Sequence, residues 1–285
     1  MKTQSGPADG SFCSKIEEIS FPALKRSFPF RLATTSYIFP TEILPNIRCL
    51  GRYFDEVELV LFESGHENNL PTPGEVREMG CLASDLDLTY NVHLPADLFF
   101  GDPDTALRRK FCETAFSFYE RTLPLCPTAY ILHLDSRRAD ETVEPDGSAW
   151  ANRVRESLEI MQTKGIELRR LAVENLEYPL QRILPFAEAF GMSFCLDIGH
   201  LLRYGHDAAE QMRSFLKMCS MVHLHGIDNG KDHKSIDHIP PTVWKAICEG
   251  LEKYHGGLSI EVFSFDDLTV SLNRMQEMVR KKGWE

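Results

Sequence analysis

The chain has 285 residues, of which 26% are charged and 43% hydrophobic, as in an ordinary water-soluble globular protein. Its 31 Lys and Arg residues are outnumbered by 42 Asp and Glu residues, so the formal net charge is −11. This charge argues against extensive, sequence-independent binding of DNA or RNA, because such binding requires a basic surface. It still allows a small anionic substrate held at a metal site.

The sequence carries few signs of a membrane or a secretory destination. It has no run of about 18 apolar residues, so we expect no membrane span. Residues 1–27 lack the continuous apolar core of a secretory signal. The eight cysteines are scattered and form no CxxC pair, which favours a reducing, cytoplasmic setting without disulfides.

Short apolar segments alternate with helical segments along the whole chain. The apolar segments are rich in Val, Ile, Leu or Phe, as expected of parallel strands covered on both faces. These expected strands span residues 31–37, 57–63, 89–95, 129–135, 171–175, 193–200, 221–226 and 258–263. The segments with a helical period or composition span residues 41–53, 73–85, 105–122, 149–163, 179–190, 207–218, 242–254 and 265–281. This alternation predicts the α/β class and a (β/α)8 TIM barrel.

A doubly wound open sheet is the structural alternative to the barrel. It usually shows a Gly-rich first turn, and no GxGxxG follows the first expected strand. We therefore expect residues 28–285 to form a single barrel domain, and residues 1–27 to form an N-terminal extension.

Most of the expected strands end with a carboxylate or an imidazole. In chain order these residues are Glu63, His93, His133, Glu174, Asp197 with His200, His223 with His225, and Glu261. The C-terminal strand ends of a barrel converge on one mouth, where active sites are built. A single His in an apolar run is more often a hydrogen-bonded core residue, but so many ligand-type residues at one edge indicate a metal site. Mixed His and carboxylate ligands suit divalent zinc, manganese, iron or cobalt, and we expect one to three ions, with zinc or manganese as the first candidates.

The seventh expected strand and the loop after it carry further polar residues. His223 and His225 share a strand face, so one could bind a metal while the other contacts substrate. The loop over residues 226–236 adds Lys231, Asp232 and His233. Its two glycines predict a segment mobile enough to fold over the mouth, with a polar surface loop as the alternative.

Residues 195–207 (CLDIGHLLRYGHD) resemble the sixth-strand motif of the xylose isomerase-like barrels, which include the type IV apurinic endonucleases. The strand ends VHLP, ILH, VEN, VHL and IEV follow in that family's order between about residues 29 and 280. The resemblance implies as metal ligands His93, His133, Glu174, Asp197, His200, His223, His233 and Glu261. It leaves a complete third metal position open, because Asp232 lies directly beside His233 and not two residues before it. Sugar isomerases and epimerases of this superfamily use a smaller set, which would be Glu174, Asp197, His223 and Glu261 around one ion.

Other segments resemble a narrower family, the bacterial cobamide-remodelling phosphodiesterases (CbiR). These segments are FPFRLATTSYIFP at 28–40, ILPN at 43–46, DEVELVLFES at 55–64, NLP at 69–71 and GKDH at 230–233. The resemblance implies metal-dependent hydrolysis of the phosphoribosyl linkage in the nucleotide loop of vitamin B12-type corrinoids. The net charge of −11 fits such a substrate better than it fits DNA repair.

This hypothesis assigns roles to individual residues. Glu174 and Glu261 would be bridging or anchoring carboxylates, and Glu63 would orient or deprotonate water or hold an outer hydrogen bond. His225, Lys231 and Arg203 would bind phosphate or corrin side chains, although a surface salt bridge is an equal alternative for Arg203. Leu98, Phe99 and Phe100 would form an apolar wall for the flat substrate, unless their loop packs against its neighbour.

Three other functions remain open from the sequence. They are a single-metal sugar isomerase or epimerase, an apurinic endonuclease, and a corrinoid-binding protein without catalysis. We expect a small-molecule corrinoid as the partner, no nucleic acid and no membrane, and the sequence does not set the oligomeric state.

Overall fold

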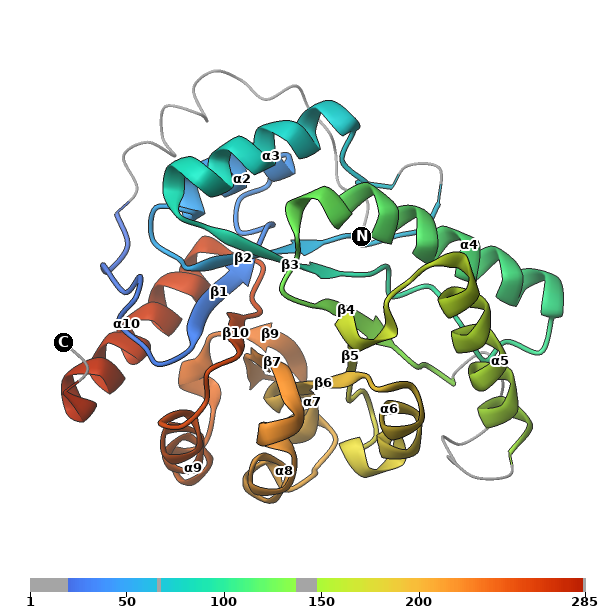
Figure 1. Cartoon of the computed structure of the whole chain (residues 1–285). Coiled ribbons are helices and arrows are strands. Elements are labelled where there is room, and N and C mark those ends of the chain that lie inside the picture. The colour runs from blue at the N-terminus through green and yellow to red at the C-terminus, as the bar shows by residue number, and fades with distance from the viewer. Residues whose placement is uncertain (1–19, 66–67, 137–147, 284–285) are drawn as a thin grey trace.

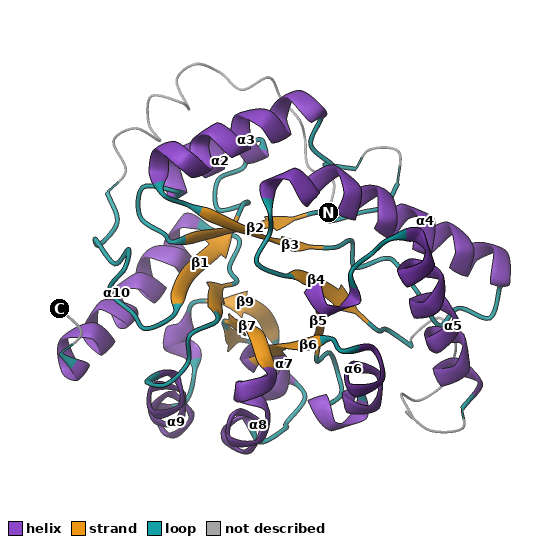
Figure 2. Cartoon of the chain, in the orientation of Figure 1, coloured by secondary structure: helices purple, strands orange, loops and turns teal. Residues whose placement is uncertain are grey.

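The structure is a computed structural model that describes residues 20–65, 68–136 and 148–283. Eight parallel strands close into a barrel, and helices surround it (Figures 1 and 2). In barrel order the strands are β1 (Arg31–Thr35), β10 (Gly257–Ile260), β7 (Cys219–Leu224), β6 (Ser193–Asp197), β5 (Leu171–Glu174), β4 (Tyr130–His133), β3 (Thr89–His93) and β2 (Glu56–Val60). The predicted (β/α)8 barrel is confirmed.

The helices follow the strands in the expected alternation. They are α2 (Ile43–Leu50), α3 (Pro73–Leu86), α4 (Thr105–Thr122), α5 (Ala149–Lys164), α6 (Leu184–Phe190), α7 (Ile198–Arg203), α8 (Ala208–Phe215), α9 (Pro241–Leu251) and α10 (Phe265–Lys282). Their ends have clear local causes. Thr72 and Glu75 form a capping box at the start of α3, and Ser264 accepts from the Asp267 amide at the start of α10.

The strands end earlier than the apolar runs suggest. β2 ends at Val60 and not at residue 63, and β6 ends at Asp197 and not at residue 200. At β6 the reason is a helix cap, because an Asp197 oxygen accepts from the His200 amide at 2.7 Å and starts α7. An apolar run therefore continues into the turn beyond each of these two strands.

Part of the expected N-terminal extension packs on the barrel. Phe21 and Leu24 are buried, and the Phe21 ring centroid lies 5.3 Å from that of Tyr53 and 5.5 Å from that of Phe265. Lys25 Nζ donates to the Gly51 carbonyl at 2.8 Å. Residues 1–19 lie outside the described ranges. Within those ranges, no helix has both the length and the apolar character needed to cross a bilayer.

Candidate metal centre

The strand register brings ligand-type residues side by side at the C-terminal mouth of the barrel. His133 on β4 is the register partner of Glu174 on β5, and Asp197 on β6 is the partner of His223 on β7. Neighbouring parallel strands in register carry their side chains at the same height, so these four groups converge. The described side chains form four overlapping groups there that could each hold a metal ion, and three of these groups consist of imidazoles and carboxylates alone.

The first group consists of His93, His133 and Glu174. Glu174 Oε2 lies 3.3 Å from His93 Nε2 and 3.0 Å from His133 Nε2. The other ring nitrogen of His93 contacts the Leu94 carbonyl at 2.8 Å. That backbone contact fixes the ring so that Nε2 faces the carboxylate, an arrangement typical of metal-binding histidines.

The second group consists of four residues, Glu174, Asp197, His223 and Glu261. His223 Nδ1 lies 3.2 Å from Glu261 Oε2, 3.7 Å from Glu174 Oε1 and 3.9 Å from Asp197 Oδ2. All four side chains are buried. Three carboxylates around one imidazole form a compact, strongly anionic set of donors.

The third group consists of His200, His225 and His233. Asp197 joins it to the second group, because Asp197 Oδ1 lies 3.2 Å from His225 Nε2 and Oδ2 lies 3.4 Å from His200 Nδ1. Asp232 does not enter this group. His225, which we expected to contact substrate, lies within this group beside His200 and His233.

Glycine in the DIGH segment makes room for this third group. A Cβ at Gly199 would lie 2.0 Å from Cε1 of the His225 ring, far inside contact distance. The ring of His225 therefore packs directly on the first turn of α7. Any larger residue at position 199 would displace that imidazole.

A β-hairpin positions His233. The segment after β7, which we expected to be a mobile loop, forms the antiparallel strands β8 (Gly226–Asp228) and β9 (Lys231–Lys234). Asn229 and Gly230 make the turn with φ of 50° and 75°, as an Asn-Gly hairpin turn requires. His233 itself has a φ of 53°, and its Nδ1 lies 3.2 Å from the Glu261 carbonyl oxygen. Such a backbone conformation is uncommon outside glycine and is often found at functional sites.

The electrostatics of the centre favour bound positive charge. Burial alone would raise the pKa of Glu174, but His133 and His223 outweigh it and hold that pKa well below its usual range. Burial lowers the pKa of His200, but Asp197 and Glu174 outweigh it and raise that pKa to about 11. Burial also lowers the pKa of His223, but Cys195 and the carboxylates Glu58, Glu261 and Glu174 outweigh it and raise that pKa well above its usual value.

The donor set fits a divalent metal ion. Among the described residues, Glu261 Oε2 and the His223 Nδ1 atom that faces it are buried without any hydrogen-bond partner. Buried polar atoms without partners are costly, and a cation between them would satisfy them. Imidazole nitrogens and carboxylate oxygens are the usual ligands of zinc and manganese.

Cys195 lies next to Glu174 and His223 and could be read as a ligand. Burial raises the pKa of its thiol well above the usual value, although His223 acts in the other direction. It is the thiolate that binds metal ions, and this burial disfavours the thiolate. We interpret Cys195 as a small apolar residue of the core.

A family model described as a xylose isomerase-like TIM barrel matches residues 47–282. The chain belongs to this family. No curated protein sequence matches it.

Several solved structures resemble the chain in fold. A D-tagatose 3-epimerase-like protein is 20% identical, with a TM-score of 0.67, and the match covers 89% of this chain and 99% of that protein. Endonuclease IV from Thermus thermophilus is 14% identical, with a TM-score of 0.67 and coverage of 88% and 99%. An L-ribulose 3-epimerase is 16% identical, with a TM-score of 0.64 and coverage of 89% and 97%. At these identities the comparisons establish the barrel and not the reaction.

Three of the residues assigned from the sequence lie outside the three groups. Glu63 is exposed, three residues beyond the end of β2. Lys231 is exposed near the hairpin turn. Arg203 forms an ion pair with Asp232, as the salt-bridge alternative predicts.

Glu58 is the buried carboxylate that the sequence analysis missed. It lies inside β2, fully buried, with Oε2 3.2 Å from His223 Nε2. A signal was present, because a charged residue in the apolar run Val57-Glu-Leu-Val-Leu is expensive to bury unless it has a role.

The expected apolar wall takes a different form. Leu98 and Phe100 are 1% exposed and pack under the surface. Instead, a half-buried aromatic ring follows β1, and exposed aromatic rings follow β2 and β10. We call Tyr37, Phe62 and Phe263 the aromatic rim. Ring centroids of Tyr37 and Phe62 lie 4.4 Å apart, those of Phe62 and Phe263 lie 6.0 Å apart, and Phe263 lies 5.1 Å from the His233 ring.

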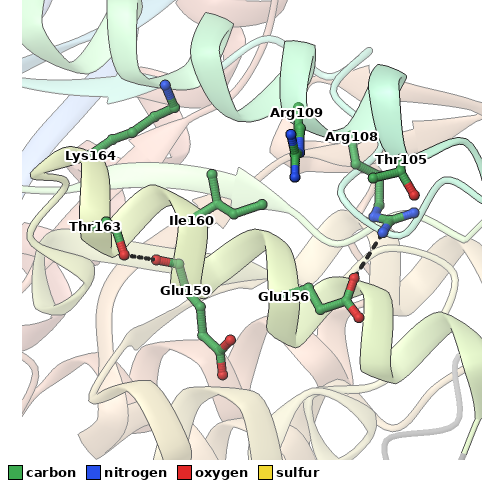
Figure 3. Close-up of a pocket in the computed structure, with 8 residues that line it drawn as sticks. All are labelled: Thr105, Arg108, Arg109, Glu156, Glu159, Ile160, Thr163 and Lys164. Carbon is green, nitrogen blue, oxygen red and sulfur yellow. Dashed lines mark hydrogen bonds and ion pairs between the residues drawn. The ribbon is translucent and has the colours of Figure 1, made fainter.

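A separate groove of about 550 Å³ lies between α4 and α5 on the outer layer (Figure 3). It is lined by Thr105, Arg108, Arg109, Glu156, Glu159, Ile160, Thr163 and Lys164. Arg108 Nη2 and Glu156 Oε2 form an ion pair of 2.8 Å across it. None of the three groups contributes a residue to its lining, so we interpret this groove as part of the helix packing.

Proposed function

We propose that the protein hydrolyses a phosphodiester, namely the phosphoribosyl linkage in the nucleotide loop of a cobamide, with divalent metal ions as cofactors. The observation that carries this proposal is the presence of two histidine-rich groups beside the four-residue group. A reaction that needs one ion would use only the four-residue group. Several ions close together suit a phosphodiester, because they can stabilise both the attacking and the leaving oxygen.

The chain's own residues would hold and order this centre. Bound divalent ions would supply an activated water and neutralise charge on the phosphate. Glu174 belongs to the first and second groups, and Asp197 links the second to the third, so these two carboxylates would set the spacing between ions. The fully buried His223 and His225 form the floor of the centre.

The direction from which the substrate approaches the centre can be inferred from which imidazoles are exposed to solvent. His133, His200 and His233 are the most exposed imidazoles of the centre, with side chains 13%, 14% and 26% accessible. A phosphate would therefore reach the centre from their side. Phe263 adjoins His233 there, so a group attached to that phosphate would meet the aromatic rim.

The aromatic rim supports a large, flat substrate. Phe62 and Phe263 are 41% and 37% exposed, although exposure of large apolar rings to water is unfavourable. Both the corrin ring and a heteroaromatic lower base offer planar faces for aromatic contacts. A corrinoid partner and a cytoplasmic setting are parts of this proposal.

The direct experiment incubates the purified, zinc- or manganese-loaded protein with cobalamin. We expect the absorption spectrum of the corrinoid to shift as the lower base leaves, and a corrinoid without its lower base to appear by mass spectrometry. His93→Ala should abolish turnover, whereas Glu188→Gln on the exposed side of α6 should not change it. An intact cobalamin after incubation with the loaded protein would contradict the proposal.

A single-metal sugar epimerase is the second candidate. Glu174, Asp197, His223 and Glu261 form a complete four-ligand set by themselves, and epimerases are among the structural neighbours. Elemental analysis separates the two candidates. One ion per chain together with epimerisation of ketoses would favour the epimerase, and two or three ions would favour the hydrolase. A nicking assay on abasic duplex DNA tests whether the protein is instead an apurinic endonuclease.

A further inference from the structure

β2 carries two carboxylates into the barrel, and their surroundings differ sharply. Glu56 and Glu58 are both 0% exposed. Glu56 has four donors: Arg31 Nε, Thr89 Oγ1 and Thr128 Oγ1 at 2.9 Å, and Asn91 Nδ2 at 2.7 Å. Among the described residues, neither oxygen of Glu58 has any hydrogen-bond partner.

A buried carboxylate without a hydrogen-bond partner is energetically costly, so the imidazole that lies closest to Glu58 in an ion-pair contact is informative. Glu58 Oε2 lies 3.2 Å from His223 Nε2, across the barrel interior. The other ring nitrogen of His223, Nδ1, lies 3.2 Å from Glu261 Oε2. The two nitrogens of one imidazole therefore face in different directions, one toward Glu58 and the other toward the four-residue group.

A neutral imidazole carries one proton, and only its unprotonated nitrogen can bind a metal ion. We propose that Glu58 is a positioning residue that accepts a hydrogen bond from His223 Nε2 and thereby keeps Nδ1 free for the metal of the four-residue group. The two atoms are close enough for this bond but are not aligned for it. Bonds of this kind often tighten only when a site is filled. The inference rests on the proposed metal centre and not on the corrinoid substrate.

Glu58 could instead be a metal ligand, and the two roles differ in their consequences. In the part of the chain that the structure describes, the groups of side chains whose donor atoms converge do not include Glu58. Loss of a ligand would lower the number of ions bound at saturation. Loss of a positioning residue would leave that number unchanged and weaken the affinity, typically by about 10–100-fold.

The experiment titrates chelator-stripped full-length protein with Zn²⁺ and follows binding by calorimetry, with elemental analysis at saturation. Glu58→Ala should weaken one binding event by about 10–100-fold with the same number of ions. Glu58→Gln should lie between wild type and Glu58→Ala, because its amide oxygen still accepts a hydrogen bond. Glu56→Gln is the matched control on the same strand, and should lower the denaturation midpoint without changing Zn²⁺ affinity.

A second measurement shows directly which ring nitrogen of His223 carries the proton. Histidine ¹⁵N spectra of the Zn²⁺-loaded wild type should show His223 protonated at Nε2, and protonation at Nδ1 would overturn the inference. This spectrum and the isosteric Glu58→Gln keep the inference testable if Glu58→Ala does not fold.

The outcomes separate the inference from the proposed function. A wild type that binds no Zn²⁺ would overturn both. A wild type that binds Zn²⁺, with unchanged affinity in a folded Glu58→Ala, would overturn the inference alone. An ion missing at saturation in Glu58→Gln would make Glu58 a ligand and also overturn it.

Discussion

His133 and Glu174 are register partners on neighbouring strands, and their Nε2 and Oε2 atoms lie 3.0 Å apart. The other oxygen of the same carboxylate, Oε1, lies 3.3 Å from His200 Nδ1. Glu174 therefore belongs to two metal groups and borders the third. Its loss should disturb more than one ion.

We expect Glu174→Ala to bind at least one ion fewer per chain than wild type and to lose about 10²–10⁴-fold in hydrolysis rate. The reason is that charge stabilisation by bound ions is worth several kcal/mol, and about 1.4 kcal/mol corresponds to a factor of ten. Elemental analysis and the cobalamin assay measure the two effects. Glu188→Gln is the control. A Glu174→Ala protein with the wild-type ion count would refute the shared role of this carboxylate.

Gly199→Ala should damage the third group selectively. The new Cβ would lie 2.0 Å from the His225 ring, so the ring must move. We expect a loss of about 1–3 kcal/mol in the free energy of unfolding, as for overpacking, and one bound ion fewer. Urea denaturation and elemental analysis measure these changes.

Gly80→Ala in α3 is the matched control for this prediction. A Cβ there meets nothing within 4 Å, so the variant should be neutral or gain up to about 1 kcal/mol from helix propensity. Equal changes in stability and in bound ions for Gly199→Ala and Gly80→Ala would show that His225 does not need the space that Gly199 leaves for its ring.

The metal-free protein should lose stability as the pH rises. The pKa of His200 is raised to about 11 in the folded state, because Asp197 and Glu174 outweigh burial, and is about 6.5 in the unfolded chain. A raised folded-state pKa stabilises the fold fully below about pH 6.5, and that stabilisation is lost between pH 6.5 and 11. From this group alone, the free energy of unfolding should fall by at most about 1.4 kcal/mol per pH unit.

Chemical denaturation with a chelator across pH 6–10 measures this slope. His200→Gln should flatten it, whereas His255→Gln, at an exposed histidine that contacts the Pro29 carbonyl, should not. Saturating Zn²⁺ should weaken or reverse the dependence, because the ion needs unprotonated imidazoles. An unchanged slope in His200→Gln would count against the prediction.

The sequence predicts the barrel well because each strand and helix carries its own local pattern. The ends of the strands are harder to predict from the sequence, because β2 and β6 end while the apolar run continues. Asp197 and His200 remain together despite this, because the cap that ends β6 also brings them close. Because β2 ends early, Glu63 lies outside the centre. The carboxylate of β2 that lies beside the centre is Glu58.

The third group depends on contacts that single-sequence patterns do not reveal. His225 and His233 come together through the hairpin turn at Asn229 and Gly230 and through the space at Gly199. The spacing of His223 and His225 could not decide which one binds metal, because both lie on the same strand face. Burial of Leu98 and Phe100 also follows from packing between loops, which the apolar run alone does not specify.

The aromatic rim should govern the recognition of large substrates and not the chemistry. Phe62 is 41% exposed and contacts Tyr37 and Phe263, but is in neither the metal groups nor their hydrogen bonds. We expect Phe62→Ala to raise KM for cobalamin by about 5–30-fold, because the loss of one aromatic contact costs about 1–2 kcal/mol. Hydrolysis of a small phosphodiester such as bis(p-nitrophenyl) phosphate should change little.

Leu123→Ala is the control for the rim, because Leu123 is a similarly exposed apolar residue that follows α4 at the opposite end of the barrel. If Phe62→Ala lost activity equally toward both substrates, Phe62 would be needed to hold the metal centre in place and not to bind the large substrate. A KM for cobalamin equal to that of wild type would mean that the flat part of the substrate lies elsewhere. Only a selective effect on the large substrate agrees with a rim that borders His233 and receives the group attached to the phosphate.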